Sequence, residues 1–215
     1  MSPGAQAIEN EKANGPRSRK GVRTRARLVE AAKHVFEDTG FLDARISDIA
    51  ERAGLSHGSF YHYFDSKEQV FREVAERVYE RISAPLTEVV LAPSSTATPA
   101  ERLRQAIRDY LETYREEARI MGVIEQMSRY DDYVRDVLVA RHRHSTEQIA
   151  GSIGQLQRRR MADRQLDPSV AAAALGAMTS RFAEMWLAQG LLECNLDDAA
   201  EQLTTLFINA LGLRS

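Results

Sequence analysis

Cysteine is almost absent from this chain of 215 residues, which contains one, Cys194. A single cysteine cannot close an intrachain disulfide, and a thiolate metal site needs several ligands at short spacings. We therefore expect neither a disulfide framework nor a cysteine-bound metal. Because an isolated cysteine behaves as a small apolar side chain, we predict that Cys194 lies in the core.

Long apolar runs are also missing. No stretch approaches the 18 or so consecutive apolar residues that a membrane-spanning helix requires, and residues 1–16 contain no apolar run typical of a signal peptide. Wholesale disorder is excluded as well, because 43% of the residues are hydrophobic and 28% are charged. We expect a cytoplasmic globular protein with no membrane partner and with one large domain or two small ones.

Motifs that carry catalysis or bind metals are scarce. The chain contains no Gly-rich phosphate loop and no His-Glu-x-x-His sequence. His142 and His144 are two residues apart, which would place them on nearly opposite sides of a helix and prevent them from chelating one ion. We predict that the protein is not an enzyme, with no catalytic residue, no metal site and no cofactor.

The net charge of −2 conceals a strong asymmetry. Residues 12–33 contain eight basic side chains and one acid, whereas residues 34–215 contain 21 basic and 28 acidic side chains. A basic segment at a domain edge is typical of nucleic-acid binding, because each phosphate that it neutralises releases condensed counterions. Solvated basic tails are also common, so the segment alone leaves both interpretations open.

Apolar residues then repeat at helical spacing. Residues 1–18 show no periodicity and are expected to form a disordered arm that leads into the basic segment. A helix is expected next, and Gly40 is placed where it can end this helix. A small domain is expected over residues 19–65, and a longer helix over residues 66–84, ending before Pro85, is expected to connect it to the rest of the chain.

Two short helices are predicted inside the small domain, over residues 46–53 and 56–64. Gly54 lies at the corner between them, where a residue free to adopt positive φ is needed, and Ser56 can cap the second helix. Two helices crossing at such a corner form a helix-turn-helix. Its second helix must expose a first turn to base edges and bury its far side, and the small or polar residues 56–59, followed by aromatic residues, fit that requirement.

One run of residues here is highly specific. Ser56 to Glu68 reads SHGSFYHYFDSKE, and it is preceded by Asp48-Ile49-Ala50 and Ala53-Gly54. With these letters the segment from Thr24 to Glu68 resembles the amino-terminal domain of the TetR family of bacterial transcriptional regulators. The sequence departs from the family pattern at Arg45, where Ser or Thr is usual. Arg45 cannot cap a helix as those residues do, but it could reach a phosphate.

The resemblance implies that the first turn of the second short helix lies in the major groove of DNA. His57 is the variable position and therefore the candidate for reading sequence, with a phosphate contact as its alternative. Tyrosine hydroxyls, His62 and the Lys67 ammonium are expected to position the helix on phosphates. The predicted DNA-binding residues are Arg45, Ser47, Ser56, His57, Gly58, Ser59, Tyr61, His62, Tyr63 and Lys67, and the basic residues that could follow the backbone or enter a minor groove are Arg17, Arg19, Lys20 and Arg23.

The rest of the chain, residues 85–215, shows only helical patterns and corresponds to the family's ligand-binding and dimerisation domain. With a polar loop at residues 93–99 and Asp167 as a cap before Pro168, we predict an all-α protein of about nine helices. Asp197 is expected to cap the last helix. The last two helices carry more apolar surface than a single core can bury. Packing against a second copy would bury that surface and form a four-helix interface, although small residues also fit ordinary helix contacts.

The resemblance further implies a small-molecule effector in this second domain. Aromatic and methionine side chains suit an apolar or aromatic ligand, but the same stripes are typical of a plain core. The candidate lining residues are Tyr110, Tyr114, Met121, Met127, Met178, Phe182, Met185 and Trp186. Two basic runs, Arg141–His144 and Arg158–Arg160, either meet an anionic group of a ligand or stay solvated.

These features predict a ligand-responsive transcriptional repressor that binds a palindromic DNA operator as a homodimer and is released by its effector. An activator of the same fold is the alternative, because the sign of regulation comes from the family alone. A helical adaptor for protein partners would leave the basic segment and the run that starts at Ser56 without a role.

Overall fold

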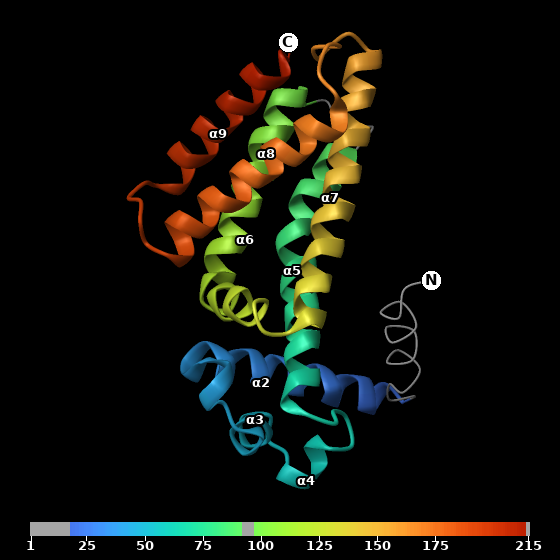
Figure 1. Cartoon of the computed structure of the whole chain (residues 1–215). Helices are drawn as coiled ribbons and strands as arrows, with labels where there is room; N and C mark the ends of the chain where they lie inside the picture. Colours follow the sequence, from blue (N-terminus) through green and yellow to red (C-terminus); the bar gives the residue numbers. More distant parts are fainter. Residues whose placement is uncertain (1–17, 92–96, 214–215) are drawn as a thin grey trace. The chain divides into compact units, whose positions relative to one another are not determined.

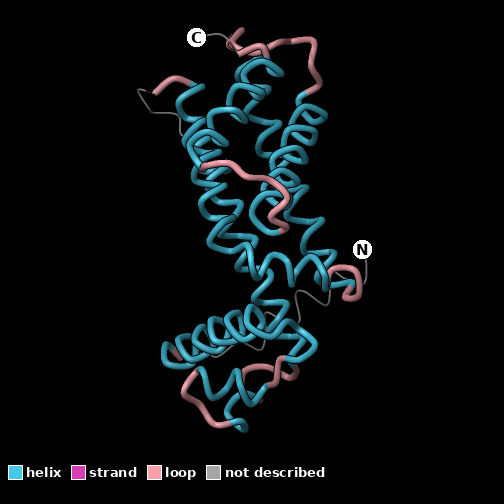
Figure 2. Tube along the Cα trace, turned by 90° about the vertical axis from the view of Figure 1, so that its left-hand side faces the viewer, coloured by secondary structure: helices cyan, strands magenta, loops and turns pink. Residues whose placement is uncertain are grey.

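The computed structural model describes residues 18–91 and 97–213, and the side chains of all of these except residues 87–91. The described segments are helices joined by loops, and no strand occurs in them (Figure 2). The predicted arm, apart from Ser18, and most of the predicted 93–99 loop lie outside the described residues. The helices are α2 (Arg19–Asp43), α3 (Ile46–Arg52), α4 (His57–Phe60), α5 (Lys67–Leu91), α6 (Pro99–Met127), α7 (Asp132–Arg158), α8 (Pro168–Ala183), the π-helical turn η1 (Glu184–Ala188) and α9 (Leu196–Leu211).

The chain divides into two compact units, residues 1–75 and residues 76–215. Helix α5 contributes its first residues to the first unit and the remainder to the second.

The first unit contains α2, α3, α4 and the start of α5 (Figure 1). Its centre is aromatic: the ring centroids of Phe36, Phe41 and Phe71 lie 4.9 to 5.7 Å apart. Phe60 and Phe64 are buried as well. Helices α3 and α4, of seven and four residues, are too short to be stable alone, so they depend on this shared core.

Turns and caps in the first unit follow the predicted pattern. Gly40 (φ 74°) interrupts α2 near its end and Gly54 (φ 66°) follows α3, so both glycines adopt the left-handed conformation that other residues avoid. The Ser56 hydroxyl accepts a hydrogen bond from the Ser59 N–H at 3.3 Å and caps α4. Arg45 occupies the N-cap position of α3 without a side-chain cap.

The second unit is built around α6, with α9 and η1 packed on it and α8 packed on α7 (Figure 1). The buried residues of α6 recur at helical spacing from Ala106 to Ile124 without a break. Residues 99–127 therefore form one helix, and the described residues contain eight α-helices, close to the predicted nine. None of the described helices is both long and apolar enough to cross a membrane.

Pro85 lies inside α5 and does not end it, contrary to the prediction. Proline has no N–H, so the helix loses one hydrogen bond at this position. Val78 and Ile82 are buried on the preceding turns, and this packing anchors the helix up to the proline.

Two predictions for the loop between η1 and α9 are wrong. Asn195, rather than Asp197, caps α9, because the Asn195 side chain accepts a hydrogen bond from the Asp198 N–H at 2.8 Å. Cys194 is exposed rather than in the core. The loop that carries it runs over the surface, and an isolated cysteine in the sequence contains no signal that distinguishes the two positions.

Candidate nucleic-acid interface and ligand cavity

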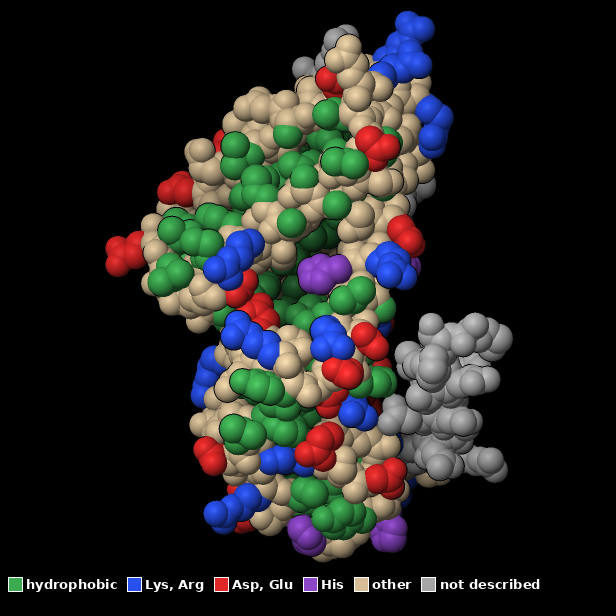
Figure 3. Space-filling view, in the orientation of Figure 1, with side chains coloured by type: hydrophobic (Ala, Val, Ile, Leu, Met, Phe, Trp, Pro, Cys, Tyr) green, Lys and Arg blue, Asp and Glu red, His purple; other side chains and the backbone are tan. Residues whose placement is uncertain are grey.

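The first turn of α4 and the residues after it form an exposed surface, which we call the recognition surface and define as His57, Gly58, Tyr61 and His62. All four residues are exposed, Tyr61 to 49%. The ring centroids of Tyr61 and His57 lie 5.5 Å apart. Figure 3 shows histidine side chains on the surface of this unit. Imidazole and hydroxyl groups can donate hydrogen bonds to phosphate oxygens and base edges.

The other predicted contacts of the helix-turn-helix differ in exposure. Arg45 and Ser47 are exposed, whereas Ser59 and Tyr63 are half-buried. The Ser56 and Ser59 hydroxyls lie 2.7 Å apart and hydrogen-bond each other. Residues 54–58 also fit the Gly-x-Ser-x-Gly pattern of hydrolases, but that pattern requires a strand before the serine, and here it connects α3 to α4.

Two arginines of α2 hold the recognition surface in place. The Arg25 guanidinium donates hydrogen bonds to the Tyr63 carbonyl at 2.5 Å and to the Glu73 carboxylate at 2.7 Å, and it lies 4.2 Å from the centroid of the Phe64 ring. Arg27 donates to the carbonyl of Ala53, at the corner before α4. A four-residue helix is thus fixed by groups 26 to 38 residues away in sequence, which spacing alone could not reveal.

Lys67 was predicted to contact phosphate, but the structure gives its ammonium another role. The ammonium donates to the carbonyls of Phe41, Leu42 and Ala44 at 2.7, 3.1 and 2.9 Å. These carbonyls follow the break at Gly40 and lack helical partners, so the ammonium satisfies them. All three N–H donors of Lys67 have partners inside the first unit, and its contact with phosphate stays a prediction.

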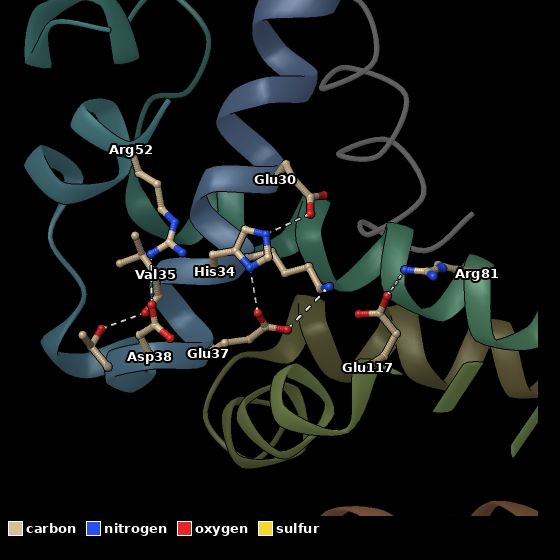
Figure 4. A network of polar contacts seen from close by, with 10 residues as sticks. Glu30, His34, Val35, Glu37, Asp38, Arg52, Arg81 and Glu117 are labelled. Carbon is tan, nitrogen blue, oxygen red and sulfur yellow. Dashed lines mark hydrogen bonds and ion pairs between the residues drawn. The ribbon is translucent and has the colours of Figure 1, made fainter. Parts of the chain in front are cut away.

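Further charges of the first unit are paired internally. His34 lies 3.2 Å from Glu30 and 3.0 Å from Glu37, and Arg52 lies 2.9 Å from Asp38 (Figure 4). The exposed basic residues at the start of α2 are Arg19, Lys20 and Arg23, while Arg17 lies outside the described residues. Within the described part of the basic segment, positive charge therefore reaches the surface at Arg19, Lys20 and Arg23 and again at Arg27.

The second unit contains a cavity of about 610 Å³ between α5, α6, α7 and α8, and Figure 3 shows the surface of this unit hollowed. Tyr110, Tyr114 and Met121 line the cavity, as they would in the predicted effector pocket. The other five predicted residues do not line it; these are Met127, Met178, Phe182, Met185 and Trp186. Phe182 and Trp186 instead pack on each other, with centroids 5.9 Å apart.

Polar groups outside the predicted set of lining residues also line this cavity. Tyr79 comes from α5, Glu125 from α6 and Glu184 from η1. The π-helical turn η1 follows α8 directly and begins at Glu184. The two glutamates are 59 positions apart in the chain, so only the packing of η1 on α6 brings them together.

Burial dominates the electrostatics of the cavity. Burial and the neighbouring Glu184 carboxylate raise the pKa of Glu125 to about 7. Burial, together with the Glu125 charge, also raises the pKa of Tyr110 and Tyr114, so both phenols stay neutral. Desolvation lowers the pKa of His142, which favours its neutral form.

The basic runs divide between cavities and solvent. Arg141 and His142 line the larger cavity, and Arg159 lines a second cavity of about 380 Å³ whose other walls include Leu103 and Phe207. Arg141 is half-buried, and every other member of the two runs is exposed, His142 and Arg159 included.

Comparisons with known proteins cover both units. Residues 28–74 match the model for bacterial regulatory proteins of the tetR family, and residues 96–211 match the model for a tetracyclin repressor-like C-terminal domain. The HTH-type transcriptional regulator YdgC of Bacillus subtilis is 42% identical over 79 residues, 37% of this chain and 40% of YdgC. This chain therefore matches less than half the length of that relative.

Longer matches are weaker in identity. The regulator UidR of Escherichia coli K12 is 27% identical over 192 residues, 89% of this chain and 90% of UidR. A TetR-family regulator from Mesorhizobium loti has a crystal structure with a TM-score of 0.76 and 19% identity, covering 89% of this chain and 98% of that chain, which shows a shared fold. Because the C-terminal family model alone matches more than half of the sequence, this chain belongs to the tetR family of bacterial regulatory proteins.

Proposed function

We propose that this protein is a transcriptional repressor that binds a palindromic operator as a homodimer and releases it when a small molecule fills the cavity of the second unit. The observation that carries this proposal is the recognition surface, which exposes hydrogen-bonding groups on a helix held by Arg25 and Arg27. The C-terminal family model is named after a repressor, which supports repression over activation.

On DNA, we assign His57 to base readout and the Tyr61 hydroxyl and His62 to phosphates. Gly58 lets the backbone of α4 come close to the duplex. The remaining predicted contacts, Arg45, Ser47, Ser56, Ser59 and Tyr63, flank this surface in sequence, and Lys67 supports it from inside. Exposed basic residues at the start of α2 add charge that attracts the phosphate backbone.

The homodimer is supported by apolar residues on the last helices. Val170 of α8 is 67% exposed and Leu206 of α9 is 51% exposed, and Figure 3 shows apolar side chains gathered over these helices. Exposed apolar groups in such number mark an interaction surface. Two copies joined there would present two recognition surfaces to half-sites about 34 to 36 Å apart on one face of the duplex.

Helix α5 offers a route from effector to operator. Tyr79, Ile82 and Leu86 of α5 line the cavity, and the same helix begins at Lys67 in the first unit. A ligand that favours one position of α5 would change operator affinity by the difference in its binding free energy to the two states, typically about 1 to 3 kcal/mol.

The test is fluorescence anisotropy with the DNA upstream of the protein's own coding region, at several salt concentrations. We expect affinity to fall steeply as salt rises, because each phosphate contact contributes a slope of about −0.9 in log K against log salt. Absence of binding at about 50 mM salt would reject the proposal.

Two substitutions separate readout from positioning. Tyr61→Phe should weaken binding to operator and unrelated DNA alike, while His57→Ala should change which sequence is preferred. Matched controls are Tyr130→Phe and His144→Ala, because both of these residues are exposed in the second unit. An equal loss on all sequences for His57→Ala would reassign His57 to phosphate.

A further inference from the structure

The Tyr114 hydroxyl is buried in the wall of the large cavity without a partner. Tyr114 is 2% exposed, and its oxygen accepts or donates no hydrogen bond within the part of the chain that the structure describes. A buried hydroxyl without a partner costs about 1 to 3 kcal/mol, so such groups are rare unless a ligand or water uses them. The cavity wall thus offers a hydrogen-bonding group to whatever occupies it.

Carboxyl groups lie at the same wall. Glu125 hydrogen-bonds Glu184, and the charges of both act on the Tyr114 and Tyr79 hydroxyls. The Oε1 atom of Glu184 is already engaged in an ion pair, because it accepts from the Arg181 guanidinium and from the Gln189 amide, each at 2.6 Å. Glu125 is therefore the carboxyl available to a ligand.

Basic groups around this wall do not neutralise Glu125. Arg181, from α8, and Arg129, after the end of α6, both favour its ionised form, but burial and Glu184 outweigh them. Of the two basic α7 groups that line the cavity, His142 has a pKa lowered by desolvation, and Arg141 is not among the groups that act on Glu125. A positively charged group of a ligand could therefore pair with the Glu125 carboxylate.

We propose that the cavity binds a small organic cation, a protonated amine on an apolar or aromatic skeleton, with its ammonium between the Glu125 carboxylate and the Tyr114 hydroxyl. The ammonium donates N–H groups to both oxygens, and the rings of Tyr79 and Tyr110 supply faces that attract a cation and contact its apolar part. The cavity wall also carries Arg141 and Arg181, and because Arg181 pairs with Glu184, Glu125 is the carboxyl group that favours a cation over an anion of the same shape. This inference rests on the proposed function for its biological meaning, since the amine would be the effector.

The amine and a proton compete for the Glu125 carboxylate. The cation favours the ionised carboxylate, so the amine loses affinity as pH falls through the pKa of Glu125, which is about 7. Between pH 8 and pH 6 the apparent Kd of the amine should rise about tenfold, because about nine in ten molecules must first lose that proton at the lower pH.

The experiment is isothermal titration calorimetry on the full chain with three probes that share one skeleton: 4-phenylbutylamine, 4-phenylbutanol and 4-phenylbutyrate. At pH 8 we expect the amine to bind about tenfold more tightly than the alcohol, and the carboxylate to bind most weakly. The Kd of the alcohol should not change between pH 8 and pH 6. Equal or tighter binding of the alcohol or the carboxylate, or no binding of the amine at millimolar concentration, overturns the proposal.

Variants locate the site. Glu125→Gln should abolish the preference for the amine and its pH dependence while the alcohol binds as before, and Tyr114→Phe, which keeps the ring, should weaken the amine several-fold. Glu112→Gln is the matched control, because Glu112 lies on the same helix outside the cavity and is paired with Arg108. An unchanged amine preference in Glu125→Gln contradicts the assignment.

Operator binding by the same preparations separates this inference from the proposed function. If the operator binds and the amine is not preferred, the cation site is wrong and the regulator stands. If the amine is preferred and no DNA binds at low salt, the site stands and the regulator is wrong.

Discussion

In the first unit the long cationic side chains of Arg25, Arg27 and Lys67 end on backbone carbonyls, whereas in the second unit the Tyr114 hydroxyl and the Gln148 carbonyl oxygen are buried without a partner among the described residues. Charge-assisted hydrogen bonds of the first kind stabilise a fold, and groups of the second kind destabilise it. The contrast matches the two tasks proposed here. A surface that meets DNA gains from being fixed in advance, while a cavity must keep polar groups available for its ligand.

Glu125 of the second unit differs in the same direction from the carboxyl groups of the first unit. In the first unit Glu37, Asp38 and Glu73 form ion pairs with basic side chains. In the second unit Glu125 faces another carboxyl group, and its pKa rises as a result of burial and that neighbour. The cavity therefore stores a destabilising interaction that a cation would relieve, a pattern found where proteins give up stability for binding.

Removing a cationic side chain that rigidifies the first unit should change the free energy of unfolding most. Lys67→Met removes the ammonium and keeps most of the side-chain length, leaving three carbonyls without their donor. The free energy of unfolding should fall by about 2 kcal/mol, as followed by circular dichroism in urea, with Lys20→Met as the exposed control. Unchanged stability together with a weaker salt dependence of DNA binding would instead restore the phosphate contact predicted from the sequence.

The next effect concerns the proton stored in the cavity. Folding raises the pKa of Glu125 from its ordinary value of 4.5 to about 7, so the native state holds a proton that the unfolded chain releases between these values. The free energy of unfolding therefore falls as pH rises through that window. Glu125→Gln should be about 1.5 kcal/mol more stable than the native sequence at pH 8, a value reduced for the solvent that reaches this half-buried group, and equal to it near pH 4.5.

Thermal unfolding at pH 4.5 and pH 8 checks this expectation. Glu112→Gln serves as the control, because Glu112 lies on the same helix in an exposed ion pair. A Glu125→Gln variant that is no more stable at pH 8 than at pH 4.5, relative to the native sequence, would show that Glu125 is ionised without penalty.

Gly58→Ala tests the recognition surface without disturbing the fold. A Cβ added at Gly58 meets no atom within 4 Å, so the protein itself accommodates the methyl group. If α4 approaches DNA through this residue, operator affinity should fall about tenfold, the equivalent of about 1.4 kcal/mol, with unchanged thermal stability. Gly122→Ala is a matched control, because Gly122 also has open space and lies on α6. Full affinity in Gly58→Ala would place the DNA elsewhere.

The fourth and weakest effect concerns the unpaired hydroxyl group of the second unit. Tyr114→Phe removes a buried hydroxyl that has no partner and leaves the ring in place. The apo protein should become more stable by about 1 kcal/mol in urea unfolding. Tyr130→Phe, at an exposed position, should change stability little, and a loss of stability in Tyr114→Phe would mean that the hydroxyl already has a partner in the apo protein.

Local features of the fold were predictable because their causes are local. Gly54 and Ser56 mark a corner and a cap through their own backbone and side-chain preferences, and Asp167 with Pro168 mark the start of α8 in the same way. Pro85 misled the prediction because its cost is also local, while the packing that outweighs it comes from the rest of the molecule.

Sites made by distant residues were predicted less completely. Tyr110, Tyr114 and Met121 share one face of α6, so helical spacing could propose them together. Nothing in the spacing joins Glu125 to Glu184, or Lys67 to the end of α2, because these contacts depend on which helices pack together.

The family, the helical architecture and the candidate DNA-reading turn are thus encoded in short stretches of residues whose preferences act within a few positions. The contacts of Lys67 and Glu125 and the unpaired state of the Tyr114 hydroxyl among the described residues arose only when helices distant in sequence came together, because burial and pairing of polar groups are properties of the packed molecule.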